Sequence, residues 1–243
     1  MEIDVALTAD AARAMSLVGV AVLVIDVLRA STSIITALVN GCDGVIPVAD
    51  AADARRRAGG LPPGTAVFAG ERRGEPLEGF DLGNSPLEFT AERVARKTLI
   101  MTTSNGTRAL LAARGAAAVG VAALVNLGAA ALWAAGGRRD VTLVCAGERG
   151  AISVEDHACA GLLVDRLQRE EPAARLSEAA REALTFGRRY GKDVGRLGED
   201  SSWARHLTAR GRGHDVAACL LLDTTTLVPV YLPHIDKVVV GSR

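Results

Sequence analysis

Short apolar runs alternate with helical patterns along most of this chain, and this alternation constrains the fold more than any other feature. The runs at residues 20–26, 98–103 and 140–147 are apolar almost throughout, as expected for strands buried on both faces. A helical pattern follows each of them. The sequence therefore predicts an α/β fold with a largely parallel or mixed sheet and helices on both faces.

The expected elements can be placed by residue range. We expect strands at 20–26, 43–49, 65–70, 98–103, 117–126, 140–147 and within 227–241, and helices at 31–41, 50–59, 85–95, 106–115, 127–137 and 153–170. Residues 171–212 are charged and helical with glycine breaks, which favours a lid or flank within one domain of residues 1–243. The tetrapeptide AGER occurs at 69–72 and 146–149, which leaves a weak internal duplication open.

The bulk composition argues against several classes of function. Lys plus Arg and Asp plus Glu are equal at 28 each and aromatic residues make up 3%, so neither a basic field nor a stacking platform for nucleic acid is expected. We recognise no secretion signal and no membrane-spanning stretch. The four cysteines are far apart, which is typical of buried, reduced thiols. These features predict a cytoplasmic protein.

Polar residues gather where the predicted strands end. In open α/β sheets, ligands bind beyond the carboxyl ends of the strands. The four ends that follow residues 25, 70, 101 and 147 carry acids, arginines or hydroxyls. Carboxylates suit a hard cation, whereas arginine and hydroxyl groups suit an anion. Their recurrence favours a site for a metal-bridged phosphate ester, and it would also suit a phosphate-binding protein without turnover.

The first of these ends contains Asp26 followed by Arg29. A carboxylate here suits Mg²⁺, which takes few protein ligands, and an arginine can clamp phosphate oxygens with two parallel hydrogen bonds. The alternative is that Asp26 caps the next helix and Arg29 joins a surface ion pair. Leu28 occupies the place of a second acid, so the DxDxT pattern of aspartyl-phosphate phosphatases is absent.

The third and fourth ends hold further motifs. Residues 102–106 (TTSNG) open a helix, where N–H groups and hydroxyls suit a phosphate; an ordinary cap and turn is the alternative. The fourth end supplies charged residues before and within the first turn of a helix: Glu148, Arg149, Glu155, Asp156 and His157. A plain capping acid and a structural histidine are the alternatives there.

Five blocks of sequence carry a resemblance to a known family. They are VIDVLRASTSI, GERRGEPLEGFDLGNSP, TTSNGTRAL, CAGERGAISVEDHACAG and GHDVAACLLLDTTTLVPVY. In this order they resemble the 2-phosphosulfolactate phosphatase (ComB) family over residues 20–231. The resemblance implies a three-layer α/β/α fold and a Mg²⁺-dependent acid phosphatase that cleaves 2-phosphosulfolactate to sulfolactate and phosphate, a step toward coenzyme M. Residues 171–211 match only loosely, which leaves the natural substrate in doubt.

The resemblance also implies site residues. The matching positions are Asp26, Arg29, Ser31, Thr32, Glu71, Arg72, Asp81, Asn84, Thr103, Ser104, Asn105, Arg108, Glu148, Glu155, Asp156, His157 and Asp215. From these and Arg149 we assign three roles. Catalysis falls to Asp26, Arg29, Asp156 and His157; phosphate binding to Arg29, Ser31, Thr32, Arg72, Thr103, Ser104, Asn105 and Arg149; and Mg²⁺ coordination to two or three of Asp26, Glu71, Asp81, Glu148 and Glu155.

Several questions stay open at this point. The attacking group is either a metal-activated water or an acid such as Asp26, and His157 or Asp156 protonates the leaving alkoxide. A spare arginine (Arg73, Arg108 or Arg149) pairs with a sulfonate or carboxylate of the substrate. The rival hypothesis is a non-catalytic binding or sensor module for a phosphorylated acid. No nucleic acid or membrane partner is expected, and a homodimer is left open.

Overall fold

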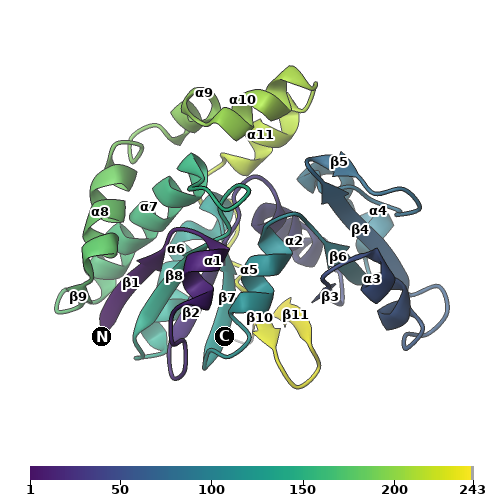
Figure 1. Ribbon diagram of the computed structural model, residues 1–243, viewed down its shortest axis with the longest axis horizontal. Helices are drawn as coiled ribbons and strands as arrows, with labels where there is room; N and C mark the ends of the chain where they lie inside the picture. Colours follow the sequence, from purple (N-terminus) through teal and green to yellow (C-terminus); the bar gives the residue numbers. More distant parts are fainter. Residues whose placement is uncertain (242–243) are drawn as a thin grey trace.

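The computed structural model describes residues 1–241, in which eleven strands form one mixed sheet in the order β5-β4-β6-β3-β11-β10-β7-β2-β8-β1-β9 (Figure 1). The strands are β1 (Glu2–Ala6), β2 (Ala21–Ile25), β3 (Gly44–Pro47), β4 (Ala66–Arg72), β5 (Glu75–Pro76), β6 (Thr98–Thr102), β7 (Ala118–Ala122), β8 (Val141–Cys145), β9 (Arg175–Leu176), β10 (Pro229–Leu232) and β11 (Lys237–Val240).

Eleven α-helices connect and flank these strands within the same residues. They are α1 (Ala9–Arg13), α2 (Ala30–Val39), α3 (Ala51–Ala58), α4 (Ala91–Val94), α5 (Gly106–Ala112), α6 (Leu127–Gly136), α7 (Val154–Glu170), α8 (Glu178–Arg188), α9 (Leu197–Asp200), α10 (Ser202–Ala209) and α11 (Gly213–Cys219). Three short 3-10 helices complete the inventory: η1 (Pro86–Glu88), η2 (Leu124–Asn126) and η3 (Val194–Arg196).

The sheet contains two groups of parallel strands. Strands β7, β2, β8, β1 and β9 are parallel to one another, and so are β3, β6 and β4. The β10–β11 hairpin lies between the groups and is antiparallel to its neighbour at every contact. Because neighbouring strands twist by about 20–25°, the twist accumulated across the sheet rotates one group relative to the other. Three antiparallel pairings separate the groups, which therefore run in opposite directions, and residues at the ends of β2, β4, β6 and β8 line one cavity.

Alternating side chains of β2 explain the three layers. Leu23 and Ile25 pack on one face with residues of α6, α7 and α8, whereas Val22 and Val24 pack on the other face with residues of α1, α2 and α5. All four are buried, and complete burial of such a side chain contributes roughly 1.5–3 kcal/mol. The three-layer α/β fold with a mixed sheet agrees with the prediction.

The structure corrects several predicted elements. The helix expected at 85–95 is broken into η1 and α4, because buried Phe89 turns its backbone out of helical geometry between them. The strand expected at 117–126 ends at Ala122 and continues as η2. Strand β1, which lies between β8 and the edge strand β9, was not predicted, although its residues alternate between apolar and polar.

Residues 171–212 begin with the short edge strand β9 and continue as the helices α8, α9 and α10. Helix α8 packs along α7, and α9 and α10 follow it. Figure 1 shows α9, α10 and α11 together along the upper edge of the view, above the sheet. This segment is helical, as predicted, and it brings one side chain to the cavity described below.

Two further observations concern the whole described chain. Within residues 1–241, none of the helices combines the length and the apolar character that crossing a membrane requires. The four cysteines are buried, as expected, and none forms a disulfide among the described residues.

Candidate active site

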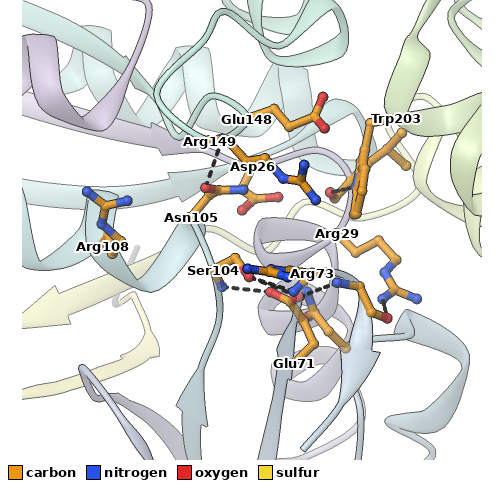
Figure 2. A pocket seen from close by; sticks show the side chains of 13 residues that line it. Asp26, Arg29, Glu71, Arg73, Ser104, Asn105, Arg108, Glu148, Arg149 and Trp203 are labelled. Carbon is orange, nitrogen blue, oxygen red and sulfur yellow. Dashed lines mark hydrogen bonds between the residues drawn. The ribbon is translucent and has the colours of Figure 1, made fainter.

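A cavity of about 460 Å³ lies where β2, β4, β6 and β8 end (Figure 2). Its lining comes from four strand ends and two further segments: Asp26, Leu28, Arg29, Glu71, Arg73, Gly74, Asn84, Ser104, Asn105, Arg108, Glu148, Arg149 and Trp203. Among them only Leu28 and Trp203 carry large apolar side chains. A cavity so rich in acids, arginines and amides suits a small charged ligand.

Asp26 lies at the end of β2, directly before α2. Its backbone N–H donates to the Ser31 hydroxyl at 2.9 Å, and its Oδ1 accepts the Ala30 N–H at 3.1 Å. Gly106 lies against the other oxygen, because a β-carbon there would come within 2.6 Å of Asp26 Oδ2. Among the described residues, Oδ2 accepts no hydrogen bond. The fold thus fixes this carboxylate and leaves one oxygen available to a ligand.

The surroundings of Asp26 disfavour its charged form. Burial of the carboxylate raises its pKa from 3.8 to about 7, and the negative charges of Glu71 and Glu155 add to this shift. The Ala30 N–H and the Arg29 guanidinium oppose it. A bound cation would remove the penalty by supplying the missing positive charge, which is why a buried acid with this pKa marks a candidate functional site.

Glu71 is anchored in the same cavity by hydrogen bonds from two segments. One oxygen accepts the Ser104 N–H at 2.7 Å, and the other accepts the Gly74 N–H at 2.6 Å and the Ser104 hydroxyl at 3.2 Å. The side chain is 6% exposed. These bonds tie the end of β4 to the loop after β6, so Glu71 both shapes the cavity and offers it a carboxylate.

Two arginines present unpaired charge to the cavity. Arg73 and Arg149 each lie in a tight turn, with φ of 56° and 52°, and each is followed by a glycine with positive φ. Neither forms an ion pair with another residue in the part of the chain that the structure describes. The Arg73 N–H donates to the Ser104 hydroxyl at 3.1 Å, and the Arg149 N–H to Asn105 Oδ1 at 3.4 Å. Both guanidinium groups are therefore available to an anion.

Arg29 has a different environment. It is 2% exposed and forms an ion pair with Asp215, and it also donates to the Gly74 carbonyl at 3.1 Å. The Ser85 hydroxyl donates to the second oxygen of Asp215 at 2.6 Å. Because Asp215 balances its charge, Arg29 lines the cavity mainly as a fixed donor rather than as a free cation. The ion pair considered as the alternative for Arg29 does form, but it is buried and not at the surface.

Asp156 holds two strand ends together instead of lining the cavity. It accepts the N–H of Val27, after β2, at 2.8 Å and the N–H of Gly147, after β8, at 3.2 Å. It is 2% exposed, and burial together with the charges of Asp26 and Glu155 raises its pKa well above the usual value. The structure therefore assigns Asp156 a role in positioning the loops, whereas a part in proton transfer was expected.

Several other predicted site residues also lie outside the cavity lining. The Ser31 and Thr32 hydroxyls donate to the carbonyls of Val24 and Val27, and the Thr103 hydroxyl accepts the Thr107 N–H. The Arg72 guanidinium donates to Ala49 O and Thr102 Oγ1, away from Arg73. In each case backbone groups or neighbouring hydroxyls satisfy the side chain that was expected to bind phosphate.

The remaining three predicted residues point elsewhere for separate reasons. Asp81 is exposed and accepts the Phe68 N–H at 2.8 Å. Glu155 is buried beside the cavity, where desolvation raises its pKa although hydrogen bonds from Ser201 and Ser153 oppose the shift. His157 faces α8 and stacks on Phe186 with 4.2 Å between ring centroids, and burial lowers its pKa.

The cavity acids can be tested against the needs of Mg²⁺. Among residues 1–241, no three His, Cys, Asp or Glu side chains gather closely enough for a ready metal-binding cluster. Mg²⁺ keeps several waters and is usually held by one or two carboxylates together with substrate phosphates. Asp26, with a free oxygen and a raised pKa, and nearby Glu71 fit that requirement.

Sequence reasoning matched Asn84 to the family but gave it no role in the site, and it did not name Trp203 at all. Asn84 is 4% exposed, and no described residue donates to its Oδ1. Asn84 lies beside Ser85 in the GFDLGNSP block, and the sequence pattern there was interpreted as the beginning of a helix and not as part of a binding site. Trp203 comes from residues 171–212, where no motif pointed to a site.

Comparison with known proteins matches most of the chain to a family. A family model described as 2-phosphosulpholactate phosphatase matches residues 6–233. The chain belongs to this family. Similar proteins include three named "Probable 2-phosphosulfolactate phosphatase". The protein from Gloeobacter violaceus is 41% identical over 206 residues, covering 84% of this chain and 85% of that protein.

The other two relatives extend the coverage. The protein from Symbiobacterium thermophilum is 36% identical over 218 residues, covering 90% of this chain and 94% of that protein. The protein from Clostridium tetani is 34% identical over 240 residues, covering 98% of this chain and all of that protein. The predicted resemblance to a family of phosphoric monoester hydrolases is thus confirmed.

Proposed function

We propose that this protein is a Mg²⁺-dependent phosphatase that hydrolyses a small phosphorylated acid, with 2-phosphosulfolactate as its substrate. The observation that carries the proposal is the pairing, in one cavity, of buried acids with uncompensated arginines. Asp26 and Glu71 supply negative charge for a cation, and Arg73 and Arg149 supply positive charge for an anion. The family and the names of the relatives support the same reaction.

In this proposal the chain supplies charge and positioning. The barrier to hydrolysis of a phosphate monoester is very high, so catalysis depends on stabilising charge on the phosphoryl oxygens. Arg73 and Arg149 bind those oxygens, and Arg29, fixed by Asp215, orients the ester beside Asp26. Mg²⁺, held by Asp26 and Glu71, would neutralise charge on the phosphate and lower the pKa of water.

Glu148 is the candidate for proton transfer. It is the cavity acid whose carboxylate makes no hydrogen bond or ion pair among the described residues, whereas those of Asp26 and Glu71 accept backbone N–H groups. A free carboxylate within the cavity can accept the proton of the attacking water. Glu148 therefore replaces Asp156 and His157 as the proposed proton-transfer residue.

Phosphate release from 2-phosphosulfolactate, measured with Mg²⁺ and with a chelator, tests the function. We expect release only with Mg²⁺, and a loss of about 10³-fold in kcat/KM for Asp26→Asn. Asp81→Asn is the matched control, because Asp81 lies outside the cavity and asparagine can still accept the Phe68 N–H. It should keep near-normal activity.

Three results would count against this proposal. Full activity of Asp26→Asn would show that the cavity is not the active site. Equal losses of activity in Asp26→Asn and Asp81→Asn would instead favour the metal site expected from the sequence, in which Asp81 is also a ligand. Binding of 2-phosphosulfolactate without release under any divalent metal would favour a binding module. A place in coenzyme M synthesis, a cytoplasmic location and a homodimer remain predictions that accompany the proposal.

A further inference from the structure

Trp203 brings the one large aromatic side chain to the cavity, and it comes from the segment that the sequence described least. It lies in the first turn of α10, whose N-terminus is capped by the Ser201 hydroxyl accepting the Ala204 N–H at 3.0 Å. The rest of the lining is almost entirely polar. Figure 2 shows Trp203 across the cavity from Asn105 and Arg108.

Three contacts fix the orientation of the indole ring. Its N–H donates to the Leu28 carbonyl at 3.1 Å, in the loop that follows Asp26. Its six-membered ring covers Gly74, where a β-carbon would lie 3.1 Å from Cη2 and 3.3 Å from Cζ2. His206 stacks on it with 4.9 Å between ring centroids. The ring is therefore a rigid wall rather than a side chain free to swing away.

Helix α10 is also tied to the turn that carries Arg73. Just beyond the helix, Arg210 and Arg212 pair with Glu75 at 2.7 Å and 2.8 Å, and Arg212 donates to the Gly74 carbonyl. The aromatic wall and the arginine of the candidate phosphate site therefore form one connected unit. Any group attached to a phosphate held by Arg73 extends into space bounded by Trp203 and Leu28.

We propose that Trp203 is a specificity-determining residue, which packs against the carbon chain of the phosphorylated acid and excludes bulkier phosphate esters. The proposal rests on the proposed function and adds the group that selects the organic part of the substrate. An aromatic face supplies apolar contact for a short carbon chain, while the surrounding arginines and amides take its acidic groups. A fixed ring also sets an upper limit on the size of the ester.

Kinetics with two substrates provide the first test. We expect Trp203→Ala to raise the ratio of kcat/KM for p-nitrophenyl phosphate to kcat/KM for 2-phosphosulfolactate by about tenfold or more, because the cavity widens and the small acid loses its contact. Trp203→Phe keeps an aromatic wall, so its ratio should stay within about threefold of the wild type. Thermal melting of both variants separates this effect from a loss of folding.

Fluorescence provides a second test that does not depend on hydrolysis. The chain has two tryptophans, and Trp133 lies on α6 beside another cavity. Trp133→Phe therefore reports on Trp203 alone, whereas Trp203→Phe reports on Trp133 alone. We expect 2-phosphosulfolactate to change the emission of the first protein saturably and to leave that of the second unchanged.

The outcomes distinguish the two proposals. A saturable change at Trp203 without phosphate release would support the contact and refute the phosphatase activity. Hydrolysis of 2-phosphosulfolactate with an unchanged Trp203 emission and an unchanged substrate ratio in Trp203→Ala would refute the specificity role and leave the activity standing. Absence of both binding and release would overturn both proposals.

Discussion

The Arg73–Gly74 and Arg149–Gly150 turns share a backbone shape and differ in their surroundings. Both pairs have positive φ throughout, at 56° and 84° in the first and at 52° and 81° in the second. The first turn closes the Arg72–Glu75 pair of β4 and β5, and the second closes the Glu148–Ala151 bridge. Two residues with positive φ are the requirement of the tight hairpin turn that matches strand twist.

Their tertiary environments are unlike. The first turn lies beneath α10, where Trp203 covers Gly74 and its carbonyl accepts hydrogen bonds from Arg29 and Arg212. The second turn is exposed, and the nearest group to a β-carbon on Gly150 would be Asp10 Oδ2 at 3.7 Å. Similar sequence therefore produces the same turn twice, but only the first turn has its backbone covered by other segments.

The largest expected difference between the turns is kinetic. Arg73→Ala should lower kcat/KM for 2-phosphosulfolactate by about 10³-fold, because the lost charge comes from a turn whose backbone is already held in place. Arg149→Ala should cost about tenfold and act mainly on KM, since fewer contacts from other segments hold its turn. Steady-state kinetics of both variants measure this, and equal losses would show that the cover over the first turn is irrelevant to catalysis.

Arg72→Ala is the control for the first turn. Arg72 precedes Arg73, but its guanidinium binds Ala49 O and Thr102 Oγ1 outside the cavity. We expect this variant to lose stability and to keep kcat once folded. A loss of kcat as large as that of Arg73→Ala would restore Arg72 as the phosphate-binding residue.

A smaller difference is expected in stability. Alanine is strained in both turns, which costs about 1–2 kcal/mol for a left-handed residue, but only at Gly74 would its methyl group also press on an indole ring. Gly74→Ala should therefore lose about 1 kcal/mol more in free energy of unfolding than Gly150→Ala. Urea denaturation of the pair decides this, and an equal loss would mean that Trp203 moves aside without cost.

The smallest effect concerns Asp26, which lies between the two arginines in Figure 2. Its pKa of about 7 in the folded protein exceeds the ordinary 3.8, so the folded state binds a proton that the unfolded state has released. Without Mg²⁺, this contribution to stability is complete below pH 3.8 and is lost as the pH rises through 7. If neither Arg73 nor Arg149 neutralises the Asp26 carboxylate, its buried charge destabilises the wild type at pH 8. Asp26→Asn should then melt a few degrees higher than the wild type at that pH.

Adding Mg²⁺ checks the cause of that difference. The metal should raise the melting temperature of the wild type at pH 8 and leave that of Asp26→Asn unchanged. If the two proteins melt together at pH 8 without metal, then an arginine from one of the turns already neutralises the carboxylate.

The sequence predicted where the site would form better than which side chains would form it. The ends of β2, β4, β6 and β8 were all predicted to be polar, and the structure brings residues from all four into one cavity. That prediction depends on local pattern, because apolar runs and the residues after them are adjacent in the chain. It needed no knowledge of how β10 and β11 join the two parallel groups.

The individual side chains depend on features that local pattern does not encode. Successive helical residues point about 100° apart, so if Asp156 faces the strand ends, then His157 must face α8. Likewise, the choice between Arg72 and Arg73 depends on a turn with positive φ at Arg73, which the AGER repeat alone does not reveal. Trp203 is 175 residues from Leu28, and only the tertiary fold brings them together.

The position of the β10–β11 hairpin has a consequence for how the protein is made. Strands β10 and β11 follow all the other strands in the chain, yet they lie inside the sheet between β7 and β3. During synthesis, the two parallel strand groups emerge first and cannot be joined through the sheet until Pro229–Val240 has left the ribosome. The cavity, which takes residues from both groups, therefore cannot reach its final form before residues 229–240 have been made.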